Sequence, residues 1–384
     1  MITQHNIYSV LRAKDWRYST LPFVTGCLYL FVFLFDLSFE KETLLFLCSF
    51  IVSAIGFACS GYLINEFFDI ESDTQAGKDN KLSRLSGIKI SALFIISFIL
   101  LFIPWIWLPS DPVSWILIFS ELTLLLMYSI PYPRLKNIYW ISGSIDSLYA
   151  YVIPLLLAFH TNSIYSGKTM DAVIFLFLLA IFFFGFRNIL IHQLRDSIHD
   201  SKAGIMTLPQ KLGAKKTNLF LTASMLLEVF FFCFFSVLLS IAHPVFILWT
   251  AVFAGIIVFN FLTKQATDKE LHSTDISKYS FTDIAYQLWF PLFNIFLLIY
   301  QDWRWVFLLP LHIILLIPRF RLEVVYFLTE KVFVKIKIAW HFIVLHFISR
   351  PANYIIYYFF KLFNVDLRKK NMSAFSFLVT FLKK

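Results

Sequence analysis

The stretch GYLINEFFDIESD, residues 61–73, contains the end of a long apolar run and the polar residues that follow it. In it Asn65, Asp69 and Asp73 recur every four residues, so on an α-helix the three side chains would share one face over about two turns. Two carboxylates and a carboxamide are costly to concentrate at a bilayer surface unless a cation lies among them. Such oxygen ligands suit Mg²⁺, which also recruits substrate phosphates. The triplet therefore predicts a metal–diphosphate site in a membrane protein.

The composition of the whole chain agrees with a membrane location. Hydrophobic residues make up 59% of the 384 residues and charged residues only 15%, and the mean hydropathy is +0.74. These values lie outside the range of soluble domains. We therefore expect an all-α fold, a polytopic bundle of membrane helices that uses most of the chain.

Apolar runs of roughly the length needed to cross the hydrocarbon core occur nine times, and a tenth, shorter run lies at about 303–318. We predict one transmembrane helix for each of the nine. The nine runs lie at about 20–38, 43–65, 88–108, 113–131, 138–159, 171–193, 216–241, 244–263 and 284–300.

Basic residues alternate sharply between the loops. Among the loops between the runs, those after the second, fourth, sixth and eighth runs carry most of the lysines and arginines, and the N-terminus adds Arg12, Lys14 and Arg17. The positive-inside rule therefore predicts that the N-terminus and these loops are cytoplasmic. We expect an integral membrane protein, in the inner or plasma membrane if the source is bacterial. The net charge of +9 reflects this asymmetry and does not indicate nucleic-acid binding.

The C-terminal part of the chain has a different character. From about residue 319 onward, basic residues interrupt aromatic and aliphatic ones, and a second basic cluster follows at Arg368, Lys369 and Lys370. This pattern is typical of interfacial amphipathic helices. We expect residues 301–384 to form a membrane-associated extension that follows a transmembrane domain of residues 1–300.

A second acidic pair follows the sixth run. Asp196 and Asp200, with His192 one step before them, repeat the four-residue interval. The turn Thr207–Leu208–Pro209 is expected to end this segment before the next run. If the two acidic helices face each other across a cavity, their four carboxylates and Asn65 would hold two or more Mg²⁺ ions around one diphosphate.

A basic loop after the fourth run supplies a third polar cluster. Tyr132 and Lys136 are also four residues apart, and Arg134 lies between them. A phenol, a guanidinium and an ammonium group are suitable donors to phosphate oxygens. All three clusters fall on the predicted cytoplasmic face, so they predict one diphosphate site.

At this point the chain resembles the UbiA superfamily of intramembrane prenyltransferases. That family has nine transmembrane helices around a central cavity, with an NxxxDxxxD motif after the second helix, a YxxxK motif after the fourth and a DxxxD motif after the sixth. The same order occurs here over about residues 8–300. The matching residues are Asn65, Asp69 and Asp73, then Tyr132 and Lys136, then Asp196 and Asp200.

The resemblance implies Mg²⁺-dependent transfer of a prenyl group from an isoprenyl diphosphate to a lipophilic acceptor, with an aromatic acceptor as the default. It implies that Asn65 and the four motif aspartates hold the metal and that the aspartates are catalytic together with Lys136. Lys136, Tyr132, Arg134 and Asn65 would bind the diphosphate. No residue specifies the acceptor, the prenyl chain length or the oligomeric state.

Two charged residues lie deeper in the predicted spans. Asp146, in the fifth run, is expected to face the cavity and is the candidate for acceptor binding, and Arg187 in the sixth run is expected to be inward-facing and paired. Two alternatives remain open, a transporter and a non-catalytic or trafficking protein built on the same fold. A di-iron hydroxylase is disfavoured, because the nine histidines form no HxxxH or HxxHH box.

Overall fold

The structure is a computed structural model that describes residues 7–17, 19–77, 79–169, 172–202, 206–265 and 281–319. These residues are helical and contain no strand, which confirms the expected all-α class. One compact unit extends from Met1 to Leu316 and a second from Ile317 to Lys384. The amphipathic helices that we predict from about residue 319 onward lie outside the described residues, which end at residue 319.

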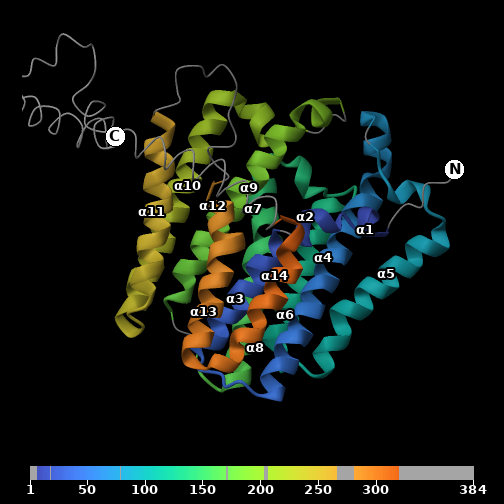
Figure 1. The fold of residues 1–384 in the computed structure, drawn as a ribbon. Coiled ribbons are helices and arrows are strands. Elements are labelled where there is room, and N and C mark those ends of the chain that lie inside the picture. Colours follow the sequence, from blue (N-terminus) through green and yellow to red (C-terminus); the bar gives the residue numbers. More distant parts are fainter. Residues whose placement is uncertain are drawn as a thin grey trace, which may run out of the picture. The chain divides into compact units, whose positions relative to one another are not determined.

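The helices of the first unit pack side by side as a bundle (Figure 1). Each of the ten predicted apolar runs coincides with a helix or a pair of joined helices. The helices are α1 (Ile7–Val10), α2 (Ala13–Arg17), α3 (Thr20–Leu34), α4 (Lys41–Ala76), α5 (Gly87–Phe102), α6 (Pro112–Ser129), α7 (Ser142–Ser147), α8 (Ile153–Ser166), α9 (Ile174–Lys202), α10 (Leu208–Ala242), α11 (Phe246–Gln265), α12 (Phe281–Ile284), α13 (Phe290–Gln301) and α14 (Leu308–Arg319).

Seven described segments are long and apolar enough to cross a membrane, against the nine spans predicted. The other two predicted spans correspond to α11, whose apolar stretch covers Phe246–Gly255, and to the segment 281–301. That segment contains a π-helical turn at η6 (Ala285–Trp289) between α12 and α13. A second π-helical turn, η4 (Leu148–Val152), interrupts the predicted fifth span between α7 and α8.

Short polar sequences set the ends of the long helices. Gly77 ends α4 in the left-handed region at φ 70°, which a glycine adopts without strain. The Oε1 atom of Gln210 accepts from the backbone nitrogen of Thr207 at 3.0 Å, so the turn predicted to separate two helices is the first turn of α10. The long α10 is kinked at Gly213, where φ is 74° and ψ is 167°.

The middle of the bundle is filled by aromatic side chains from four elements. The ring of Phe23 on α3 lies 6.0 Å from the rings of Phe184 and Tyr286 and 6.5 Å from that of Tyr151. Tyr151 and Tyr286 belong to the two π-helical turns. A π turn shifts the side-chain register of a helix, and such turns are frequent at functional sites. These four residues are called the aromatic cluster below.

Candidate active site

Helix α4 continues beyond its apolar part to Ala76, so the predicted acidic stripe lies on a regular helix. Asn65, Asp69 and Asp73 are all half-buried. The chain after α4 folds back over this stripe, because the Nδ2 amide of Asn80 donates to the Oδ2 atom of Asp73 at 3.0 Å and to the carbonyl oxygen of Glu66 at 2.9 Å. The sequence analysis missed Asn80, although the left-handed cap at Gly77 reverses the chain there.

Asp69 is bound by two cations from the loop that follows α6. Its Oδ1 atom accepts a hydrogen bond from Nη2 of Arg134 at 2.9 Å and a second from Nζ of Lys136. Arg134 also donates to the hydroxyl of Ser72 at 3.1 Å. The side chains of Arg134 and Asp69 are 19% and 15% exposed, and that of Lys136 is 11% exposed. The second carboxylate of the stripe, Asp73, also interacts electrostatically with Lys136, so two cations face two carboxylates here.

Burial lowers the pKa of Lys136, while the neighbouring carboxylate of Asp69 opposes that shift. Arg134 adopts a left-handed backbone conformation with φ 45°, which costs a non-glycine residue energy. The tight turn therefore holds both cations against α4. An anion at this position would receive donors that are already in place.

Tyr132, the third residue predicted in this loop, lies elsewhere. Its side chain is 90% exposed. The structure thus brings Lys136 and Arg134 to the acidic stripe and leaves Tyr132 at the surface. The sequence spacing could not show this, because the loop contains a short helical turn, η3 (Leu135–Asn137), and is not one continuous helix from 132 to 136.

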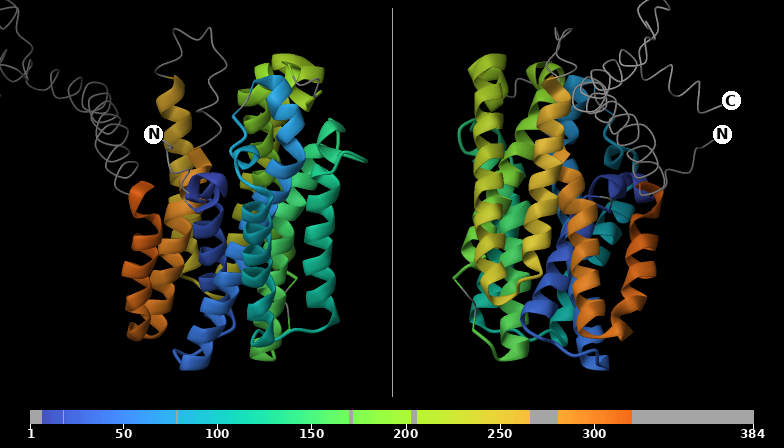
Figure 2. Two further views of the ribbon diagram at one scale, coloured as in Figure 1. Left: turned by 90° about the vertical axis from the view of Figure 1, so that its right-hand side faces the viewer. Right: turned by 60° about the vertical axis from the view of Figure 1, so that its left-hand side comes forward.

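The second acidic motif lies on α9, which contacts α4. The C-terminal ends of both helices lie at the same end of the bundle (Figure 2), called the motif end below. Asp196 is partly exposed, and its Oδ2 atom lies 3.8 Å from Nδ1 of His192. Asp200 belongs to the last turns of α9, but its side chain lies outside the described part of the structure.

The donor chemistry at the motif end fits Mg²⁺, since α4 and α9 supply carboxylate oxygens and Asn65 a carboxamide oxygen. Among the described side chains, however, no group of three or more His, Cys, Asp or Glu residues is arranged to hold a metal ion. On α4 the carboxylates are instead engaged by Lys136, Arg134 and Asn80. A metal ion would take the place of these donors.

A half-buried polar layer lies deeper than the acidic stripe. The hydroxyl of Tyr149 donates to Asp146 at 2.5 Å, and Tyr62 on α4 interacts electrostatically with Asp146. Arg12 at the N-terminus reaches the same helix, with its guanidinium 5.4 Å from the ring centre of Tyr62 and 3.3 Å from the carboxylate of Glu66. Asp146 therefore faces other polar groups inside the bundle, as expected for an ionisable residue in a span.

Arg187 is the second charged residue inside the spans, and it is paired as expected. It is fully buried on α9, where its Nε atom donates to Glu228 of α10 at 2.8 Å. Its Nη2 atom donates to Thr282 at 2.6 Å and to Asp283 at 3.0 Å, both on α12. The network ties three helices together beside Phe184 of the aromatic cluster. Its partners were not predicted, because they come from distant parts of the sequence.

Comparisons with known proteins identify the family and agree with the fold. The model of the UbiA prenyltransferase family matches residues 29–280. Structures of a UbiA homologue from Archaeoglobus fulgidus bound to Mg²⁺ with DMAPP or GPP are 14% and 17% identical, each with a TM-score of 0.51 over 76% of this chain and 98% of that one. The apo structure of a UbiA homologue from Aeropyrum pernix K1 is 15% identical, with a TM-score of 0.52 over 73% and 97%. A comparison with curated proteins gives no match.

Proposed function

The chain belongs to the UbiA prenyltransferase family, and we propose that it transfers a prenyl group from an isoprenyl diphosphate to a lipophilic acceptor within the membrane, with Mg²⁺. The observation that carries this proposal is the cluster at Asp69, where a carboxylate meets Lys136 and Arg134 at the end of a membrane helix. The A. fulgidus homologue, bound to DMAPP or GPP with Mg²⁺, supports the choice of donor and metal.

The residues proposed to hold Mg²⁺ are those with hard oxygen donors at the motif end. When bound, the metal would neutralise charge on the diphosphate and so favour its departure. The proposed ligands are Asn65, Asp69 and Asp73 on α4 and Asp196 and Asp200 on α9.

Lys136 and Arg134 would bind the diphosphate itself. Both cations already lie at the site, where they could turn from Asp69 to phosphate oxygens. There they would stabilise the charge that grows on the leaving diphosphate as the allylic C–O bond breaks. Asn65 and Tyr132 would add donors, which for Tyr132 requires its exposed side chain to move inward.

The aromatic cluster would hold the allylic end of the donor. Faces of Phe and Tyr rings stabilise a developing positive charge, and the packed rings exclude the water that would otherwise trap it. The acceptor carbon or oxygen would then form the new bond and lose a proton. We assign acceptor binding to Asp146, whose carboxylate is inside the bundle and accepts a hydrogen bond from Tyr149.

The test compares diphosphate release by purified protein in nanodiscs made from the lipids of the source membrane, with geranyl diphosphate as donor and added Mg²⁺. We expect Asp69→Asn and Asp196→Asn each to lower the release rate by about 10²-fold or more, because each removes a carboxylate ligand of the Mg²⁺ that would neutralise the leaving diphosphate. Asp79→Asn is the matched control, since Asp79 lies at the same end but pairs with Arg84 at the surface. Release by Asp69→Asn at the unmodified rate would overturn the proposal.

A further inference from the structure

Glu121 lies near the middle of α6, a segment that is long and apolar enough to cross a membrane. The residue is buried, with 5% of its surface exposed, and its Oε2 atom has no hydrogen-bond partner. No charged group in the described part of the chain acts on this carboxyl. A carboxyl group in such surroundings costs stability unless a partner satisfies it. Glu121 has no part in the mechanism proposed above.

Two other acidic residues inside the bundle do have partners. Glu228 pairs with Arg187 at 2.8 Å, and Asp146 accepts a hydrogen bond from Tyr149 at 2.5 Å. A polar residue in a membrane span is usually satisfied in this way, by a neighbouring helix. None of the described residues donates a hydrogen bond to Oε2 of Glu121. We therefore expect its partner to be a molecule that enters the bundle.

Glu121 belongs to the buried face of α6. Glu121 and Tyr128 are both buried and lie seven residues apart, about two turns of helix, so they point in the same direction. The ring of Tyr128 lies 5.4 Å from the ring of Tyr149, which donates to Asp146. The face of α6 that carries Glu121 is thus turned toward the half-buried polar layer at Asp146.

The same part of α6 runs beside the acidic stripe of α4. The hydroxyl of Ser129 donates to Oδ1 of Asn65 at 3.4 Å. One turn further from the motif end, a Cβ atom added at Gly61 would lie 3.5 Å from the Cδ2 atom of Leu125, so these two residues are neighbours. Glu121 comes one turn after that, about 12 Å from Ser129 along the helix axis. It therefore lies deeper in the bundle than the proposed diphosphate site.

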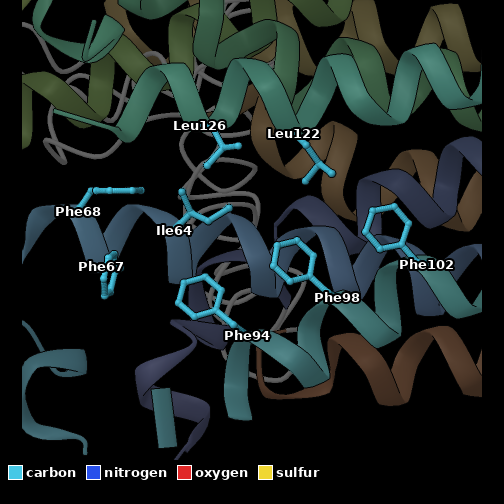
Figure 3. Close-up of a pocket in the computed structure, with 8 residues that line it drawn as sticks. All are labelled: Ile64, Phe67, Phe68, Phe94, Phe98, Phe102, Leu122 and Leu126. Carbon is cyan, nitrogen blue, oxygen red and sulfur yellow. The ribbon is translucent and has the colours of Figure 1, made fainter. Parts of the chain in front are cut away.

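The next residue of α6 faces a different environment. Leu122 and Leu126 line an apolar groove of about 390 Å³ between α4, α5 and α6 (Figure 3). The groove is at the surface of the bundle, where Leu126 is 40% exposed. Consecutive helical residues differ in direction by roughly 100°, and Glu121 is not among the residues that line the groove. A hydrocarbon chain in the groove would therefore leave the carboxyl unsatisfied.

The ligand that satisfies Glu121 must be polar at this depth. The tail of a prenyl donor is a hydrocarbon and forms no hydrogen bond, so it does not meet this requirement. A hydroxyl group donates to a carboxyl oxygen and brings no further charge into the span. We propose that Glu121 binds a hydroxyl group of the lipophilic acceptor, an inference that rests on the function proposed above. The acceptor is then an alcohol or a phenol.

The first test measures the thermal stability of the full-length protein in detergent without substrates. Glu121→Leu should raise the midpoint of unfolding by about 2 °C or more, because it removes an unsatisfied carboxyl from the interior of the bundle. A residue with a purely structural role would lower the midpoint when replaced. Thr123→Leu is the matched control, since Thr123 is an exposed polar residue two positions away on the same helix.

The second test measures transfer of labelled geranyl diphosphate to lipid in nanodiscs with Mg²⁺. The acceptor is supplied as a lipid extract of the source membrane diluted into phosphatidylcholine. Glu121→Leu should need about tenfold more extract for half-maximal transfer, the value of one hydrogen bond to a charged group, but the same concentration of geranyl diphosphate. Glu121→Gln keeps an accepting oxygen and should lose less. An equal loss in both variants would indicate a cationic ligand and overturn the assignment of a hydroxyl.

The outcomes separate this inference from the proposed function. If Glu121→Leu transferred geranyl groups with the extract dependence of the unmodified protein, the role of Glu121 would be wrong and the proposed function would stand. If the unmodified protein transferred none, the proposed function would be wrong, and with it the identification of the ligand as the acceptor. A lower midpoint of unfolding for Glu121→Leu would reveal a structural partner and overturn the inference in either case.

Discussion

At the scale of single residues, the acidic side chains of α4 are balanced before any ligand is present. Glu66 pairs with Arg12, Asp69 with Lys136 and Arg134, and Asp73 accepts from Asn80. A metal ion that arrives alone must break these contacts and leave cations beside it. A metal that arrives with a diphosphate gives the same cations a new partner, so metal and diphosphate should bind cooperatively.

This balance predicts that one substitution changes the affinity for a metal ion and the affinity for diphosphate in opposite directions. Lys136→Gln should raise the affinity for Mn²⁺ alone, because Asp69 loses a competing cation, and should lower the affinity for inorganic diphosphate by about tenfold or more, the value of one charge-assisted hydrogen bond. Electron paramagnetic resonance of Mn²⁺ and calorimetry with diphosphate measure the two effects. Lys215→Gln, on an exposed turn of α10, is the control. If Lys136→Gln weakened the binding of Mn²⁺ and of diphosphate equally, Lys136 would not exchange Asp69 for the diphosphate as proposed.

The sequence predicted this part of the site because it lies on one regular helix. Four-residue spacing places Asn65, Asp69 and Asp73 on one face of α4 whatever surrounds them. The same spacing is a poor guide in the loop after α6, where it predicts the position of Lys136 but not that of Tyr132. Asn80 escaped prediction because its contacts depend on how the chain turns after Gly77.

At the scale of elements, α6 begins at a polar contact with α8. The Oδ1 atom of Asp111 accepts from the backbone nitrogen of Ser114 at 2.9 Å and lies 2.9 Å from Nε2 of His160 on α8. The hydrogen bond with His160, and then the one from the Ser114 backbone, lower the pKa of Asp111 to about 2. The carboxylate therefore caps α6 and joins it to α8 at the end of the bundle away from the motif end.

Asp111→Ala should lower the free energy of unfolding by about 1 kcal/mol, the usual value of a helix N-cap. Because the folded-state pKa is depressed, the contribution of Asp111 is complete above its ordinary value of 3.8 and is lost as the pH falls through about 2. Thermal unfolding in detergent over this range measures both effects. Asp111→Asn keeps a capping acceptor and should lose less than the alanine variant at neutral pH. An alanine variant as stable as the unmodified protein would contradict this role.

The Arg187 network joins three further elements inside the bundle. Arg187 of α9 and Glu228 of α10 are fully buried, while Asp283 of α12 is partly exposed. Apolar periodicity predicted the existence of these helices but not the π turn that follows Asp283, because a π turn depends on packing between distant segments. Because buried charges must be paired, Arg187, Glu228 and Asp283 require α9, α10 and α12 to contact one another.

Arg187→Met should destabilise the protein by about 3–5 kcal/mol, because two carboxylates would be left without their buried cation. Arg187→Met with Glu228→Leu should recover part of this loss, since one of the two uncompensated charges is then removed as well. Thermal unfolding in detergent separates the variants. Arg195→Met, nearer the exposed end of α9, is the control. A single variant as stable as this control would show that the network carries no stability.

At the scale of the whole molecule, residues more than a hundred positions apart meet at one end of the bundle. The stripe on α4, the loop after α6 and the acidic motif on α9 are brought to the motif end because the chain crosses the bundle an even number of times between them (Figure 1). Span counting predicted this shared end, since it requires only that helices alternate in direction. The depth of the polar layer at Asp146 and the groove behind α4 depend on side-chain packing, which counting does not provide.

The shared end must also face the compartment that supplies the water-soluble diphosphate. The excess of lysine and arginine in the loops at the motif end predicts that this compartment is the cytoplasm. Ser86 directly precedes α5 and Ser110 follows it, so these two exposed residues report on the two ends of the bundle. We expect a membrane-impermeant maleimide to label Ser86→Cys only in inside-out vesicles and Ser110→Cys only in right-side-out vesicles, relative to the unmodified chain with its four cysteines. The reverse pattern would place the carboxylates and Lys136 on the outer side, away from a cytoplasmic donor.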